Sequence, residues 1–222
     1  MSNPHSKLFE EIATVFNKHG FKLYMVGGTS RDFLLGKEID DYDFATDATP
    51  DDMRAFLPAA NYRFSMFGTV TFKIQGQKVE VTTLRQEGEY RDLRHPSAIT
   101  FVREPEKDYV RRDFTVNALY IDENYQVLDF CQGLEDLKKR ILRMIGDPQV
   151  RFKEDPLRMY RALRFIVRFG FEFDLFLSNA ITENAALSKN LNPDKIAGER
   201  RKVHTEHLAK YDALCRHYQL AF

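Results

Sequence analysis

Two carboxylates at alternating positions, Asp41 and Asp43, are the residues whose types and spacing most clearly suggest chemistry. Strand periodicity places them on one face of a strand, with Tyr42 and Phe44 on the other. Two carboxylates that face one point form a hard oxygen site suited to Mg²⁺, which prefers carboxylates together with substrate phosphates. Exposed acids are also ordinary on strand surfaces, so the pair taken alone leaves a solvated surface as the alternative.

A glycine pair, Gly27-Gly28, follows a predicted strand a short distance before these acids. Glycine has no Cβ, so its backbone can approach a triphosphate closely. Two Mg²⁺ ions beside such a turn could activate an attacking hydroxyl and stabilise a leaving pyrophosphate. The glycine pair and the carboxylates together therefore favour a metal-assisted phosphate chemistry over a plain surface.

Two groups of arginines could bind phosphate. Arg111-Arg112 precede Asp113, so guanidinium groups could bind phosphate oxygens while the carboxylate binds a ribose hydroxyl; a surface cluster that opens a strand is the alternative. Asp155 and Pro156 predict the start of a helix. That helix would carry one stripe of arginines, Arg158, Arg161, Arg164 and Arg168. Arginines so close repel one another, which predicts an anion or partner between them, although a solvated helix could also carry such a stripe.

Composition bounds the class of protein without identifying it. The chain has 222 residues, is 43% hydrophobic, and has 33 Lys and Arg against 33 Asp and Glu. Acidic residues dominate positions 32–52 and basic residues dominate 138–168, which suits a metal site beside a phosphate-rich ligand or two ordinary solvated surfaces. The cysteines have no metal-ligand spacing, and no nucleophile elbow is present. No membrane-length apolar run occurs, so a soluble cytoplasmic protein is expected.

Hydrophobic spacing predicts an α+β fold followed by helices. Residues 8–19 have helical spacing, and Thr49-Pro50 marks another helix start. Strands are expected at 22–26 and 42–45, with hairpins formed by 64–74 with 78–84 and by 116–121 with 126–130. After about residue 138 the pattern is helical. We therefore expect an α+β domain over 1–137 and a helical domain over 138–222.

The segment from Gly27 to Asp43 resembles the signature of class II tRNA nucleotidyltransferases and bacterial poly(A) polymerases, members of the DNA polymerase β-like superfamily. This resemblance implies that Gly28 and Arg31 contact the nucleotide and that Asp41 and Asp43 are catalytic and hold the metals. A second family motif spans 108–118 and implies that Arg112 also contacts the nucleotide. Ser30 stands where the family usually has Val. Glu80 lies where the superfamily often has a third carboxylate, although strand alternation explains a polar residue there equally well.

Residues 154–165 are similar to the family's base-reading motif. The resemblance makes Asp155 and Arg158 the pair that imitates a template, with Arg161 and Arg164 as further nucleotide-binding residues. The chemistry fits this role, because cytosine and adenine both present an amino donor beside a ring-nitrogen acceptor. A carboxylate accepts from the first and an arginine donates to the second, whereas uracil and guanine present the reverse pattern.

The resemblance covers roughly residues 20–200 and implies a polymerase β-like head, with a mixed sheet and flanking helices, and an all-α neck. It implies a CCA-adding enzyme that extends the tRNA 3′ end from CTP and ATP with Mg²⁺. Residues 87–96 look like the family's flexible loop, which favours full CCA addition. A CC-adding, A-adding or poly(A)-adding relative, or a non-catalytic nucleotide- or RNA-binding remnant, stays open. The family's body and tail domains are apparently absent, and Gln132 replaces a family glycine.

Overall fold

A computed structural model describes residues 4–39, 41–88 and 97–221 of the chain. The chain divides into two compact units, each built from segments that are not contiguous in sequence. The first unit consists of Met1–Gly88, Ala98–Arg112 and Val116–Leu134, and the second consists of Glu89–Ser97, Asp113–Thr115 and Glu135–Phe222. The chain therefore enters the second unit briefly at 113–115 before it returns to the first.

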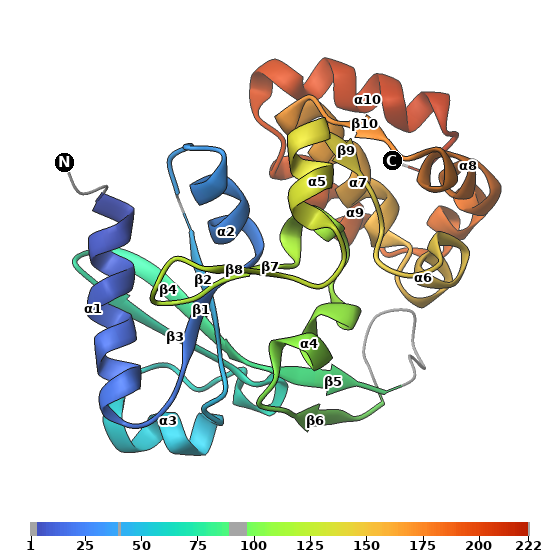
Figure 1. The fold of residues 1–222 in the computed structure, drawn as a ribbon. Helices are drawn as coiled ribbons and strands as arrows, with labels where there is room; N and C mark the ends of the chain where they lie inside the picture. The colour runs from blue at the N-terminus through green and yellow to red at the C-terminus, as the bar shows by residue number, and fades with distance from the viewer. Residues whose placement is uncertain (1–3, 40, 89–96, 222) are drawn as a thin grey trace. The chain divides into compact units, whose positions relative to one another are not determined.

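Six strands of the first unit form one mixed sheet in the order β3-β4-β2-β1-β7-β8 (Figure 1). They are β1 (Leu23–Met25), β2 (Tyr42–Thr46), β3 (Thr69–Ile74), β4 (Gln77–Thr83), β7 (Leu119–Ile121) and β8 (Val127–Asp129). Neighbouring strands are antiparallel except β2 and β4, which run parallel. A small separate sheet pairs β5 (Arg85–Glu87) with β6 (Ile99–Phe101).

The helices of the first unit leave part of one face of this sheet open. They are α1 (Pro4–Lys18), α2 (Gly27–Leu34), α3 (Pro50–Phe56) and α4 (Pro105–Asp108), with single 3₁₀ turns at Ser65–Phe67 and Tyr109–Arg111. Phe9 and Phe16 of α1 belong to one core cluster with Tyr42, Phe44 and Val79 of the sheet. Because side chains alternate along a strand, Asp43 and Glu80 point to the opposite face.

Local signals in the sequence produce the expected helix start and hairpin turn. The Thr49 hydroxyl accepts from the Asp52 amide at 3.2 Å, and the Asp52 carboxylate accepts from the Thr49 amide at 2.9 Å, which caps α3 as predicted. Gln75 and Gly76 join β3 to β4 with φ of 51° and 80°, as a two-residue hairpin turn requires. Both predicted hairpins are confirmed.

The second unit is mainly helical. Its helices are α6 (Pro148–Glu154), α7 (Leu157–Phe169), α8 (Leu175–Asn184), α9 (Pro193–Arg201) and α10 (Leu208–His217), with 3₁₀ segments at Ala185–Asn190 and Thr205–His207. The expectation of an all-α domain is wrong in one detail, because β9 (Ile141–Leu142) pairs in parallel with β10 (Glu172–Phe173). The fold class is α+β, as predicted. In the described ranges, no helix is long and apolar enough to cross a bilayer.

Two glycine positions of the family pattern behave differently from expectation. Gly27-Gly28 do not form a separate turn, because they are the first residues of α2. Gly27 has a φ of 62°, a conformation that favours glycine. Gln132 has a φ of 63°, so the residue that replaces the family glycine occupies the left-handed region at some conformational cost. Helix α5 (Gly133–Lys139) begins directly after Gln132. The residues of α5, and those of the 3₁₀ turn Thr115–Asn117, belong partly to the first unit and partly to the second.

Candidate active site

The parallel pairing of β2 and β4 brings three carboxylates to the open face of the sheet. Asp43 lies directly opposite Glu80, and Asp41 comes just before β2. These three residues line a cavity of about 160 Å³ together with Tyr42 and Lys78. Both predicted catalytic acids therefore face one cavity. The third carboxylate is Glu80, which pattern reasoning alone could not separate from an ordinary strand residue.

The surroundings of Asp43 strongly affect its carboxyl group. Burial raises the pKa of Asp43 to about 6, and the neighbouring carboxylates of Glu80 and Asp41 add to the shift. Asp41 is exposed, whereas Asp43 is half-buried. A divalent cation would offset this repulsion, and the donor set of carboxylate oxygens fits Mg²⁺.

A metal at this cavity would need ligands from outside the protein. In the ranges that the structure describes, no group of three His, Cys, Asp or Glu side chains is arranged to hold an ion. Mg²⁺ usually keeps several waters and is bound through one or two carboxylates plus substrate phosphates. The arrangement of Asp41 and Asp43 fits that mode of binding better than a closed site made only of protein ligands.

Helix α2 fixes the strand that carries the acids. The Thr29 hydroxyl donates to the Asp41 carbonyl oxygen at 3.1 Å and accepts from the Asp43 amide at 2.7 Å. Ser30 is fully buried, and its hydroxyl donates to the Gly27 carbonyl oxygen at 3.3 Å. That hydrogen bond explains how a polar side chain is accommodated where the family usually has Val. The first turn of α2 and the first half of β2 are therefore one connected structure.

Arg31 is buried, with only 4% of its surface exposed. Its Nε and Nη2 donate to both oxygens of Asp32 at 2.9 and 2.8 Å, and its Nη1 donates to the Asn117 side chain at 2.6 Å. A Cβ added at Gly28 would lie 3.6 Å from Arg31 Nη2, an ordinary contact distance. The structure thus places Arg31 beside Gly28 and gives it a clear role in holding α2 to the segment that contains Asn117.

A second cavity continues along the same face and is rich in arginine. It has a volume of about 240 Å³. Its lining includes Gly27, Asp43, Glu80, Thr82, Arg85, Arg111 and Arg112. Asp43 and Glu80 line both cavities, so predicted metal ligands and the predicted nucleotide-binding Arg112 share one region of the first unit. Guanidinium groups beside a metal site suit phosphate binding.

A buried carboxylate, Asp108, connects Arg111 and Arg112 of this cluster. It is fully buried and accepts from Arg111 Nε at 2.8 Å, from Arg112 Nε and Nη2 at 3.1 and 3.0 Å, and from the Tyr120 hydroxyl at 2.5 Å. The Arg85 amide also donates to it at 2.9 Å. Burial alone would raise the pKa of Asp108, but Arg112 and Arg111 outweigh it and hold the pKa well below its usual range.

Three arginines of α7 have carboxylate partners within the second unit. Arg158 is buried and donates to Glu154 at 2.9 Å, Arg161 Nε donates to Asp113 at 2.9 Å, and Arg164 Nε donates to Glu199 at 3.2 Å. For Arg158, Arg161 and Arg164, the anions that their close spacing predicts include carboxylates of the chain itself. Burial lowers the pKa of Arg164, whereas Asp113 raises the pKa of Arg161.

Asp155 caps the start of α7 much as its sequence predicts. Its carboxylate accepts from the Leu157 amide at 3.0 Å, with Pro156 between them. Arg158 donates as well to the Arg151 carbonyl oxygen at 2.9 Å. Both side chains of the predicted base-reading pair are thus oriented by bonds within the second unit. The buried face of α7 also includes Tyr160 and Leu163.

Sequence reasoning missed several residues that hold these side chains. Asp108 precedes Arg111 and Arg112 by three and four positions, a helical spacing that could have indicated a shared carboxylate. Glu199 meets Arg164 across a separation that no local pattern reveals. Residues 87–96, which look like the family's flexible loop, lie mostly outside the described residues.

Comparison with known proteins points to one family. A family model described as the poly A polymerase head domain matches residues 23–143. The CCA-adding enzyme of Geobacillus thermodenitrificans is 42% identical over 187 residues, which cover 84% of this chain and 46% of that protein. The CCA-adding enzyme of Leuconostoc mesenteroides is 42% identical over 199 residues, which cover 90% of this chain and 48% of that protein. The chain spans about half the length of the relatives it matches.

A solved structure agrees with these sequence relationships. The CCA-adding enzyme of Bacillus stearothermophilus in complex with CTP superposes with a TM-score of 0.82 at 37% identity, covering 91% of this chain and 49% of that one. Because the family model matches more than half of the chain and the fold agrees, the chain belongs to the poly A polymerase head domain family.

Proposed function

We propose that the chain is the nucleotidyltransferase portion of a CCA-adding enzyme, which adds C, C and A to the tRNA 3′ end from CTP and ATP. The observation that carries the proposal is the pair of cavities that share Asp43 and Glu80, one lined by acids and the other by arginines. Relatives called CCA-adding enzymes, at 42% identity, support this choice of reaction. A solved tRNA nucleotidyltransferase with a primer tRNA and an incoming ATP analog, at 30% identity, supports the choice of substrates.

Asp41 and Asp43 are the proposed catalytic residues, and they would hold Mg²⁺. When bound, Mg²⁺ supplies positive charge that favours ionisation of the attacking 3′ hydroxyl and offsets the charge of the leaving pyrophosphate. The 3′ oxygen forms a bond to the α-phosphorus while the bond from that phosphorus to the bridging oxygen breaks, and the hydroxyl proton passes to solvent. Arg112 lies beside the acids and would bind the triphosphate, held in place by Asp108.

Gly28 and Arg31 are proposed to lie against the nucleotide at the start of α2. The second unit would then choose the base, with Asp155 accepting from the amino group and Arg158 donating to the ring nitrogen of cytosine or adenine. Arg161 and Arg164 remain proposed nucleotide-binding residues. In this proposal residues 1–137 form the catalytic head and 138–222 form the neck, within a cytoplasmic enzyme.

The test is product sequencing. The chain is incubated with Mg²⁺ and a tRNA transcript that lacks its 3′ CCA, with each NTP singly and with all four together. The proposal predicts two C residues from CTP alone and CCA from the full mixture. Products that end in CC, in a single A or in an A tract would assign the alternative specificities. A chain that binds CTP but extends no RNA would be a non-catalytic remnant.

A further inference from the structure

Two lysines of the β3–β4 hairpin carry like charges at paired positions. Lys73 and Lys78 lie directly opposite each other on antiparallel strands, and both side chains are exposed. Like charges in that position destabilise a sheet. A bound anion would offset the repulsion between them.

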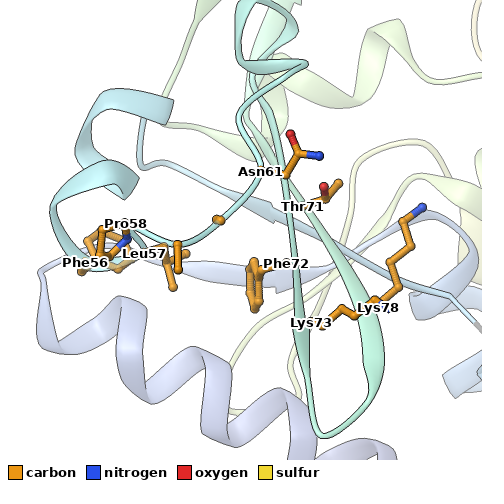
Figure 2. Close-up of a pocket in the computed structure, with 10 residues that line it drawn as sticks. Phe56, Leu57, Pro58, Asn61, Thr71, Phe72, Lys73 and Lys78 are labelled. Carbon is orange, nitrogen blue, oxygen red and sulfur yellow. The ribbon is translucent and has the colours of Figure 1, made fainter.

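The same lysines line one wall of a cavity in the first unit (Figure 2). We call this cavity, of about 710 Å³, the lysine groove. Its residues are Phe56, Leu57, Pro58, Ala59, Ala60, Asn61, Thr71, Phe72, Lys73 and Lys78. Figure 2 shows Phe72 between Leu57 on one side and Lys73 on the other. The groove therefore combines an apolar wall with two positive charges.

The lysine groove adjoins the cavity lined by Asp41, Asp43 and Glu80, which we call the acid cavity. Lys78 lines both, and in the acid cavity it lies with Asp41, Asp43 and Glu80. Glu80 and Asp43 also line the second cavity, which contains Arg85, Arg111 and Arg112 and which we call the arginine cavity. Along β4 the open face thus presents Lys78, then Glu80, and then the arginine cavity, so the acids lie between a lysine region and an arginine region.

The geometry of the reaction assigns the two positive regions to different ligands. In a phosphoryl transfer the attacking and leaving oxygens lie roughly in line, on opposite sides of the reacting phosphorus. The leaving pyrophosphate carries the denser charge and matches the forked guanidinium groups of Arg111 and Arg112. The attacking strand must then approach the acids from the other side, where Lys73 and Lys78 lie.

We propose that the lysine groove binds the RNA strand that ends in the attacking 3′ hydroxyl, with Lys73 and Lys78 on its backbone phosphates. This inference rests on the proposed function. The apolar wall formed by Leu57 and its neighbours suits the faces of ribose and bases, and positive charge beside apolar surface is typical of single-strand binding. Lys78 then marks the point where the strand reaches the acids.

The test compares two double variants of the full chain. One is Lys73→Gln with Lys78→Gln, and its matched control is Lys7→Gln with Lys18→Gln on α1, which removes the same charge from the helix that covers the other face. Steady-state addition of CMP to a tRNA transcript without CCA gives separate KM values for RNA and for CTP. The groove variant is expected to raise KM for RNA about tenfold and to change KM for CTP less than twofold. The salt slope of RNA binding should fall by about 1.4, because roughly 0.7 is lost per single-strand phosphate contact.

A charge-retaining variant, Lys73→Arg with Lys78→Arg, should keep the wild-type KM for RNA and exclude a simple loss of structure. An unchanged KM for RNA and an unchanged salt slope in the glutamine variant would overturn this inference and leave the proposed function unaffected. A raised KM for CTP with an unchanged KM for RNA would overturn it too, because the lysines would then bind the triphosphate. If the wild-type chain extends no RNA, the proposed function fails and the inference fails with it.

Discussion

Asp108 in the first unit accepts hydrogen bonds from two arginines, whereas Arg161 and Arg164 in the second unit have separate carboxylates. The cluster around Asp108 lies at a cavity that Asp43 also lines. The partners of Arg161 and Arg164 come from separate segments of the second unit, so each pair ties α7 to another part of that unit.

In the proposed function, the same residue type binds a ligand in the first unit and orients a helix in the second. Where arginines outnumber their buried acid, positive charge is left for an incoming triphosphate. Arg161 and Arg164 bond to two different acids, Asp113 and Glu199, and the gain is a fixed helix. We therefore expect substitutions in the first cluster to affect all nucleotides alike, and those at the start of α7 to affect the choice among them.

The largest effect is expected at the acids. Asp41→Ala or Asp43→Ala should lower Mg²⁺-dependent CMP incorporation by at least about a thousandfold, roughly 4 kcal/mol of transition-state stabilisation. The midpoint of thermal unfolding should stay constant or rise, because each change relieves repulsion among carboxylates. Incorporation near the wild-type rate by either variant would contradict the assignment of these residues.

Asp108→Asn should be the next largest change. It removes the carboxylate that Arg111 and Arg112 share, and breaking such a buried ion pair costs about 3 kcal/mol or more of unfolding free energy. The measurement is urea unfolding, with Glu106→Gln on the same short helix as an exposed control. Equal stability of the two variants would show that the cluster does not depend on Asp108.

Glu199→Gln should cost less, about 2 kcal/mol, because Arg164 keeps a neutral hydrogen-bond acceptor in place of its carboxylate partner. Urea unfolding again provides the measurement, and Glu172→Gln removes an exposed acid from the same unit for comparison. A loss as large as that of Asp108→Asn would contradict the distinction between shared and separate counter-charges.

The smallest effect concerns pH. The pKa of Asp43 is raised to about 6, so the folded chain retains a proton that the unfolded chain has already lost. Its ionisation therefore reduces stability as pH rises from about 4 to 6, by roughly 1–2 kcal/mol after allowance for partial exposure. Asp43→Asn should match the wild type near pH 4 and exceed its stability above pH 6 in the absence of Mg²⁺. A constant difference across this range, as expected for the exposed control Glu38→Gln, would contradict the shift.

Local patterns predicted much of the fold and of the candidate site. Thr49 and Pro50 fixed the start of α3, and the alternation around Tyr42 placed Asp41 and Asp43 on one face, because both signals act between near neighbours. The burial of Arg31 was not predictable, since one of its partners, Asn117, is distant in sequence. The role of Glu80 likewise depends on the parallel pairing of β2 with β4, which strand periodicity does not specify.

The central claim is that the first unit binds the triphosphate while the start of α7 selects the base. It is tested most directly by measuring kcat/KM for CTP and for UTP in Arg112→Ala and in Asp155→Ala. The account predicts that Arg112→Ala lowers both values and preserves their ratio, whereas Asp155→Ala lowers the ratio by about 10- to 100-fold, equivalent to roughly 1–3 kcal/mol for a lost hydrogen bond. The account is contradicted if Asp155→Ala still excludes UTP as strictly as the wild type, or if Arg112→Ala changes the ratio.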